Sequence, residues 1–555
     1  MEANRLNTSS LLDFVVWFMS ALPLGDEARI FHLVSRDFRK LPTFFLIEST
    51  NDDSALGPPT IPILGNLHQL PKSGTFLKLT EWAQQYGGIY SIKIGSGTSI
   101  VLTDRQLVRE LIDKRSSKYS QRPPSYVSDN LITQGEHMLV MQYGPLWRVF
   151  RKLVHQNFME SVVEKNYVPV QNAEAVQMLY DLCQRPDQHM LHPKRFSNSV
   201  AMSIIFGMRT PTLDTPHMTR LYHIMDDWVQ VMEPGATPPV DIFPIFHWLP
   251  QNLYKNWKKT SKRLGSNMNS LYSSLLNEVR TRRENPKYPR NTVMDSVLDQ
   301  NEKLGLTDHQ IYFFCGVLNE GASDTTATAI QSFIHAMIKW PDILRKAQME
   351  VDGVVGEDRT PVWEDYKSLP YVAMTVKEAM RWRPVVPLAF PHAATEDDWV
   401  DGYFIPKGST VIINVWGLHR DPAHFSNPDV FDPDHFKGKT ALAPQLASVL
   451  DVNQRDHYGY GSGRRICPGM HLAERNLFLA IVKLIWAFDF GPDMDEKTGL
   501  PVDVDVDPQT GYKEGLVLGA RPFACRISVR SDARRDTIVS EFEKARANVF
   551  SKYDF

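Results

Sequence analysis

The sequence predicts a mainly α-helical protein with a small β region, folded as a single large domain. Most of residues 141–352 carry apolar residues at the helical period of 3.6, interrupted by proline-rich loops. Only short runs, at 89–94, 99–102, 410–415 and 516–518, have the character of strands. Length alone would allow about three or four domains, but no linker, repeat or low-complexity run divides the chain after residue 57.

The N-terminal part differs from the rest. The apolar run 11–24 contains Asp13 and Pro23, and its 14 residues are fewer than the roughly 17–25 of a spanning helix. A charged tract and a second short apolar run follow it. We expect residues 1–56 to attach to a membrane surface or, alternatively, to form a poorly ordered soluble extension. Residues 57–66 are proline-rich and predict a stiff hinge before the main domain, 67–555.

Several elements can be placed in order. The runs 89–94 and 99–102 flank a Gly-Ser-Gly turn and predict a hairpin. Asp104 is placed to begin a helical pattern that continues to residue 114. A long apolar helix is expected at about 308–340, and an amphipathic helix at about 470–488.

The charge and cysteine content exclude some functions. With 61 basic and 64 acidic residues well mixed along the chain, nothing suggests a nucleic-acid-binding protein. The widely spaced cysteines form no zinc or disulfide pattern and indicate a reducing environment. They are Cys183, Cys315, Cys467 and Cys525.

A glycine-rich loop, 460–469, carries the strongest chemical signal. Gly461 and Gly463 permit a tight turn. Cys467 comes just before a predicted helix, whose positive end would favour the thiolate over the thiol. A lone cysteine is ordinarily a small buried hydrophobe, but this setting indicates a thiolate ligand of haem iron. Arg465 is placed to pair with a haem propionate.

Three weaker motifs precede this loop in the chain. Trp147 and Arg151 share one helical face at i, i+4 spacing. The stretch 321–326, Gly-Ala-Ser-Asp-Thr-Thr, lies in the long helix, where Thr325 can bond back to a carbonyl; steric packing of a threonine-rich stretch is the alternative. Glu378 and Arg381 form an i, i+3 pair, which in isolation would most often lie on a solvated face.

Together these motifs resemble, in order, the signatures of the cytochromes P450, over about residues 57–525. The resemblance implies the cytochrome P450 fold, with haem b as the cofactor and Cys467 as its iron ligand. Tyr460 stands where phenylalanine is usual, and Ala322 where glycine is usual. Thr325 and Asp324 correspond to the residues that deliver protons to bound oxygen.

The resemblance also assigns residues around the haem. Those expected at the cofactor are Trp147, Arg151, His392, Arg465, Gly461 and Gly463. A surface histidine is the alternative interpretation of His392. Glu378 and Arg381 correspond to a buried structural triad, whose third member here is His435 instead of arginine. A histidine titrates near neutrality and lacks the fork of donors that arginine offers.

A mainly apolar substrate pocket is expected above the haem. Counting at 100° per residue places four residues on the face of Thr325: Phe314, Leu318, Gly321 and Ala322. The resemblance adds Val386, Phe390 and Val517, and it makes residues 125–138 a variable lid. Such a pocket suits a substrate with a small aromatic or other apolar, polyketide-derived carbon skeleton.

The segments 235–241, 361–366 and 458–476 resemble fungal hydroxylases of m-cresol and m-hydroxybenzyl alcohol in patulin-type pathways. We therefore expect a haem-thiolate monooxygenase that uses O2 and electrons from NADPH–cytochrome P450 reductase, with cytochrome b5 as a second candidate donor. Its expected location is the cytosolic face of the endoplasmic reticulum membrane. The alternatives are a reductase-independent haem-thiolate isomerase or dehydratase, against which Thr325 and Asp324 argue, and a non-catalytic haem sensor.

Overall fold

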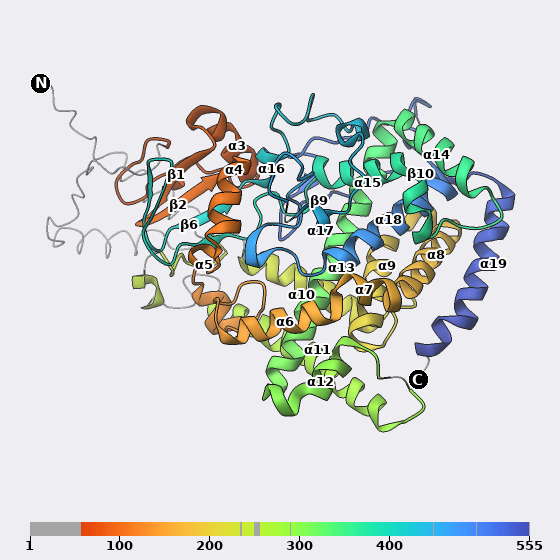
Figure 1. Cartoon of the computed structure of the whole chain (residues 1–555), viewed down its shortest axis with the longest axis horizontal. Helices are drawn as coiled ribbons and strands as arrows, with labels where there is room; N and C mark the ends of the chain where they lie inside the picture. The colour runs from red at the N-terminus through yellow and green to blue at the C-terminus, as the bar shows by residue number, and fades with distance from the viewer. Residues whose placement is uncertain are drawn as a thin grey trace, which may run out of the picture.

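Helices dominate the computed structural model of the chain, which describes residues 57–232, 236–242, 244–248, 256–288, 290–447, 449–495 and 497–553 (Figure 1). The helices are α3 Thr75–Tyr86, α4 Arg105–Val108, α5 Ser116–Tyr119, α6 Pro145–Phe158, α7 Glu160–Val162, α8 Val168–Gln184, α9 His192–Phe206, α10 Pro216–Met232, α11 Trp257–Glu284, α12 Val293–Leu304, α13 Asp308–Lys339, α14 Pro341–Val355, α15 Pro370–Trp382, α16 Val415–Leu418, α17 Ala443–Leu446, α18 Met470–Ala487 and α19 Asp532–Asn548.

The strands of the described residues are short and belong to four small sheets. They are β1 Ile89–Ile94, β2 Gly97–Leu102, β3 His392–Ala393, β4 Asp398–Val400, β5 Tyr403–Ile405, β6 Thr410–Ile413, β7 Phe488–Gly491, β8 Tyr512–Lys513, β9 Gly519–Ala520 and β10 Arg526–Val529. The largest sheet has the order β1-β2-β6-β3, in which only the β2–β6 pair is parallel. It lies at one end of the molecule, and α19 lies at the other (Figure 1).

The long helix α13 is the axis of the helical part. Thr307 begins it with a capping box, in which its side chain accepts from the backbone of Gln310 and the Gln310 side chain accepts in return. Most of its residues from Ile311 to Ile338 are buried, because α9, α11 and α18 all pack against it. A helix that is apolar nearly all round belongs inside a protein, so α13 can present residues to an interior site.

Most of the expected elements are confirmed. The helix predicted at 308–340 ends one residue earlier, and the predicted hairpin is β1–β2. Asp104 caps α4 by accepting from the Leu107 backbone, and the chain then passes into a π-helical turn, Arg109–Lys114. The fold class, mainly α with a small β region in a single large domain, is confirmed as well.

One local prediction is wrong, and a second segment contains helical structure that was not expected. Residues 516–518 form no strand but the bend between β8 and β9, because Leu516 and Val517 turn toward the interior cavity and the backbone of Leu518 donates to Val385. The expected lid, 125–138, is partly helical: Val127–Ile132 form a π-helical turn packed against α11.

The proline-rich segment 57–66 is held against β1. The Asn66 side chain donates to the carbonyls of Pro58 and Pro59 and accepts from the Lys93 backbone. The segment expected to be membrane-associated or poorly ordered, 1–56, lies outside the described residues. Within the described part of the chain, no helix combines the length and apolar character needed to cross a membrane.

Candidate active site

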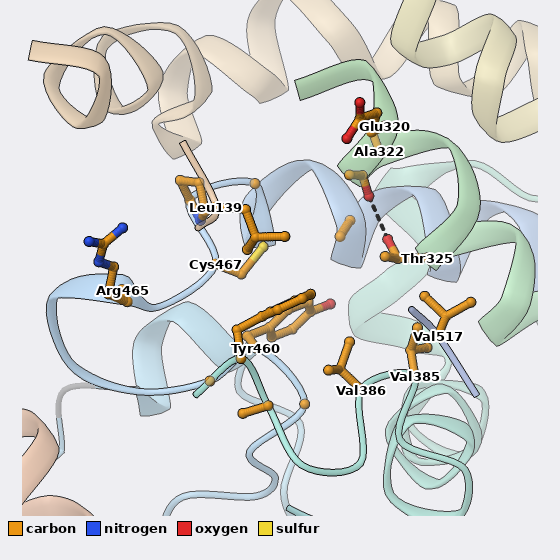
Figure 2. Close-up of a pocket in the computed structure, with 18 of the residues that line it drawn as sticks. Leu139, Glu320, Ala322, Thr325, Val385, Val386, Tyr460, Arg465, Cys467 and Val517 are labelled. Atoms are coloured by element: carbon orange, nitrogen blue, oxygen red, sulfur yellow. Dashed lines mark hydrogen bonds between the residues drawn. The ribbon is translucent and has the colours of Figure 1, made fainter. Parts of the chain in front are cut away.

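A continuous cavity of about 300 Å³ brings together three of the four sequence motifs, all but the Glu378–Arg381 pair (Figure 2). The loop 458–469 forms one wall, and α13 forms another. The segments 385–392 and 516–517 close the sides. Because most of the lining side chains are apolar, the cavity suits a ligand that is itself largely apolar.

Cys467 lies in this cavity at the end of a tightly folded loop. Gly461 and Gly463 have φ values of 74° and 66°, a region that favours glycine, and the Cys467 backbone donates to the Tyr460 carbonyl at 2.8 Å. Asp113 holds the loop from outside by accepting from the backbone of Gly463 at 2.7 Å. The loop is therefore fixed with the sulfur directed at the cavity, as Figure 2 shows.

The expectation that the helix end favours the Cys467 thiolate is wrong for the free side chain. Burial raises the pKa of the thiol, and the Gly469 backbone and the Arg151 cation lower it by less. The helix α18 begins only at Met470, which leaves the sulfur outside its first turn. A thiolate at this buried position needs a further positive charge beside it. A bound metal ion would supply that charge, and cysteine binds metal ions in the deprotonated form.

Three arginines line the cavity on the side of this loop: Arg122 is buried, and Arg151 and Arg465 are half-buried. Arg465 donates to the carbonyls of Ser120 and Met141, and its guanidinium lies 4.5 Å from the centre of the Trp147 ring. Arg151 donates to the Ile466 carbonyl at 2.7 Å. Within the described residues, neither forms an ion pair with a carboxylate.

The third arginine, Arg122, is a site residue that the sequence did not reveal. It lines the cavity and donates to the carbonyls of Leu139, Phe390 and Pro391. Burial and the Arg465 cation lower its pKa to about 9, and burial with Arg151 lowers that of Arg465 to about 10. Both side chains remain cationic at neutral pH, so this end of the cavity favours an anionic ligand.

His392 also lines the cavity, and the interpretation as a surface histidine is wrong because the side chain is buried. Burial and the Arg122 and Arg465 cations lower its pKa to about 3. A neutral imidazole whose Nδ1 faces the Tyr119 carbonyl at 2.7 Å donates from that nitrogen. His392 therefore adds no positive charge to the site as it stands.

These features fit haem b. The thiol of Cys467 supplies a ligand for iron, and the apolar walls match a porphyrin ring. The arginine cations, which have no carboxylate partner in the part of the chain that the structure describes, match the two propionates. Gly463 itself is not among the cavity-lining residues, because it packs against the Ile112 carbonyl.

The α13 wall carries the threonine motif. The Thr325 hydroxyl donates to the Gly321 carbonyl at 2.8 Å, and both residues line the cavity (Figure 2). Asp324 is also in the lining, and burial raises the pKa of its carboxyl group. Ser323, which directly precedes Asp324, faces away and binds Asn198 on α9 at 3.0 Å. The motif is thus fixed from behind while Thr325 and Asp324 face the cavity.

Six of the seven residues expected to form the pocket line the cavity: Leu318, Gly321, Ala322, Val386, Phe390 and Val517. The prediction for Phe314 is wrong. Phe314 has the same angular position on α13 as Thr325, but it lies about 16 Å away along the axis. There it is fully buried, with its ring 5.0 Å from that of Phe150.

Glu378, Arg381 and His435 are brought together outside the cavity. Arg381 holds both oxygens of Glu378, at 2.7 and 2.6 Å, and both side chains are fully buried. His435 Nδ1 lies 3.2 Å from Glu378, and its Nε2 lies 2.6 Å from the Ser426 carbonyl. Burial lowers the pKa of His435, but Glu378 and the Ser426 carbonyl together raise it further, so its net pKa is raised.

Two more cavity-lining residues, His137 and Glu320, were missed by the sequence analysis. Neither belongs to a motif. Glu320 directly precedes the stretch 321–326, and a carboxylate at that point of an apolar helix was the only signal that could have drawn attention to it.

Comparisons with known proteins agree with this site. The family model described as cytochrome P450 matches residues 56–505. The cytochrome P450 monooxygenase yanC of Aspergillus niger is 52% identical over 501 residues, which cover 90% of this chain and 93% of that protein. The cytochrome P450 monooxygenase patH of Penicillium expansum is 50% identical over 498 residues, with the same coverage. A zebra fish cytochrome P450 structure with abiraterone, at 25% identity, has a TM-score of 0.64 and covers 82% of this chain and 100% of its own.

Proposed function

The chain belongs to the cytochrome P450 family as a haem b-dependent monooxygenase, and on that premise we propose that it hydroxylates a small phenolic compound of polyketide origin in fungal secondary metabolism. The observation that carries the substrate class is the small apolar cavity that contains both Cys467 and Thr325. The 50% identity to the fungal cytochrome P450 monooxygenase patH supports the reaction type.

The bound haem supplies the oxidising chemistry, because thiolate ligation favours cleavage of the O–O bond. The roles proposed for the chain follow from the contacts already described. Cys467 is the ligand, and Arg465, Arg151 and Arg122 hold the propionates. Trp147 supports Arg465 through its ring.

Thr325 is proposed to hold a water molecule in the cavity and Asp324 to pass protons toward it. The direction of the Asp324 pKa shift suits this role, because burial favours the protonated form of the carboxyl group and a proton relay needs a group that can carry a proton. The apolar side chains Leu318, Val386 and Val517 are proposed to hold the aromatic ring and to exclude water.

The electron donor is proposed to be NADPH–cytochrome P450 reductase, with cytochrome b5 as a second candidate. We also propose that the enzyme works at the cytosolic face of the endoplasmic reticulum membrane. Both proposals rest on the family to which the chain belongs.

The test is turnover of m-cresol by the purified holoenzyme, with and without NADPH and reductase. A monooxygenase forms hydroxylated product only when both are present. Product formed from a peroxide substrate without them would favour an isomerase or dehydratase. Haem binding without turnover of any compound in a panel of small phenols would favour a sensor.

A further inference from the structure

A buried polar cluster interrupts the apolar lining of the cavity. Its centre is Glu320, whose side chain is 12% exposed, on α13. The His137 Nε2 lies 3.0 Å from one carboxylate oxygen, and the Tyr272 hydroxyl donates to the other. In Figure 2 Glu320 lies on the far side of Ala322 from Thr325. A carboxylate is costly to bury, so its place in an apolar cavity calls for an explanation.

The two partners of Glu320, His137 and Tyr272, are each held in place by packing. The His137 ring stacks on Trp228 of α10, with centroids 5.2 Å apart, and Phe313 meets it edge-on at 6.4 Å. Tyr272, on α11, lies across α13 at Gly316, where an added Cβ would come within 2.6 Å of its ring. Gly316 therefore permits the close approach that brings the Tyr272 hydroxyl to Glu320.

The cluster still has unused hydrogen-bonding capacity toward a ligand. A carboxylate has about four acceptor positions, and the described residues fill one on each oxygen of Glu320. His137 is 98% buried, and among the described residues its Nδ1 has no hydrogen-bond partner. Both side chains line the cavity. Buried polar groups are ordinarily satisfied, so this pair calls for a polar group on the ligand.

We propose that Glu320 is a specificity-determining residue that accepts a hydrogen bond from a hydroxyl group of the aromatic substrate, with His137 and Tyr272 as positioning residues. This deepens the proposed function, on which it rests. The apolar lining holds the ring of any small arene, whereas Glu320 selects arenes that can donate. A site built to pair with a hydroxyl discriminates strongly against analogues that lack one, because its own polar groups are then left unpaired.

The experiment compares three probes of similar shape: m-cresol, which can donate a hydrogen bond, 3-methylanisole, which can only accept, and m-xylene, which can do neither. Dissociation constants come from ligand-induced shifts of the haem spectrum of the holoenzyme. In Glu320→Leu, the preference for m-cresol over m-xylene should fall about 10–100-fold relative to the parent, the effect of one hydrogen bond to a charged group. In the parent, 3-methylanisole should bind like m-xylene.

Two further variants keep the test decisive. Glu320→Gln retains the shape and an acceptor, so it should lose part of the preference and still load haem if the leucine variant does not. Glu136→Leu is the matched control, because Glu136 also pairs with a histidine, His309, but does not line the cavity. Its preference should equal that of the parent.

An unchanged preference in both Glu320 variants would overturn the inference and leave Glu320 as a structural tie among α13, α11 and His137. The inference would also be overturned if the Glu320 variants coupled NADPH use to product less tightly but kept the preference for m-cresol. That result would assign Glu320 to proton delivery. Failure of the proposed function would look different. If the preference for m-cresol depends on Glu320 but m-cresol is not turned over, the inference about Glu320 is supported and m-cresol is excluded as the substrate.

Discussion

The hydroxyl of Thr325 is bonded to the Gly321 carbonyl, 2.8 Å away and one turn earlier on α13. This bond uses the only proton of the Thr325 hydroxyl. The oxygen keeps its two acceptor positions, because donating a hydrogen bond does not occupy them. Because both residues line the cavity, Thr325 can accept a hydrogen bond from a water molecule there. That relationship is the structural basis for its proposed place in proton delivery.

Replacing Thr325 with alanine should separate electron use from product formation. The variant should bind haem and substrate and consume NADPH, but the reducing equivalents should appear largely as hydrogen peroxide. Product formation should fall about 10²–10⁴-fold, the usual contribution of positioned acid–base catalysis. The measurement is the ratio of product and peroxide to NADPH consumed. Thr328→Ala, on the same helix but outside the cavity lining, should couple normally, and a Thr325→Ala enzyme that did so would contradict the role.

The Glu378–His435 contact predicts that stability depends on pH. The folded-state pKa of His435 is raised, so the folded protein binds the proton more tightly than the unfolded chain, whose histidines titrate near about 6.5. The stabilisation is fully present below that pH and is lost as the pH rises through the higher folded-state value. Denaturant titrations across this range should show a falling free energy of unfolding and weaker haem retention.

His435→Ala should remove that pH dependence and lower the free energy of unfolding at acidic pH by about 1–3 kcal/mol, the effect of losing a hydrogen bond to a buried charge. His435→Arg should load haem less well than the parent if the site is shaped for imidazole, whose Nε2 binds the Ser426 carbonyl. The exposed His223 provides the control alanine substitution. A His435→Ala protein with the parent's stability and pH profile would show that the contact contributes nothing.

The arginines that line the cavity should be required to retain haem. Arg465→Ala and Arg122→Ala each remove a cation that has no carboxylate partner among the described residues, so the loss should fall on the cofactor's propionates. Haem affinity should drop about 10–100-fold in each, measured by haem transfer to an acceptor protein. Arg464→Ala, next in sequence but exposed, should behave as the parent. Full haem retention in both Arg465→Ala and Arg122→Ala would refute the assignment.

Local signals account for what the sequence predicted well. The capping residue Thr307 and the continuous apolar run located α13 almost to the residue, and the glycine-rich turn located Cys467 in the cavity. Phe314 was misplaced because angular position on a helix says nothing of distance along its axis, and α6 covers that turn through Phe150.

The site residues that the sequence did not predict are brought to the cavity by tertiary contacts. Arg122 follows a short helix and has no motif, and it reaches the site only because Phe390 and Pro391 fold against it. The cluster of His137, Tyr272 and Glu320 joins residues up to 183 positions apart. The lowered pKa of His392 arises from burial beside Arg122 and Arg465, both of them distant in sequence. No local pattern in the chain encodes these encounters.

The most direct test of the account is the visible spectrum of the reduced, CO-bound holoenzyme of the parent and of Cys467→Ser. The parent should show the red-shifted Soret band of thiolate-ligated haem, and the serine variant, if it retains haem, should lack that band. Cys525→Ser, a cysteine outside the cavity lining, should keep it. A red-shifted band retained in Cys467→Ser would contradict the assignment of Cys467 as the iron ligand.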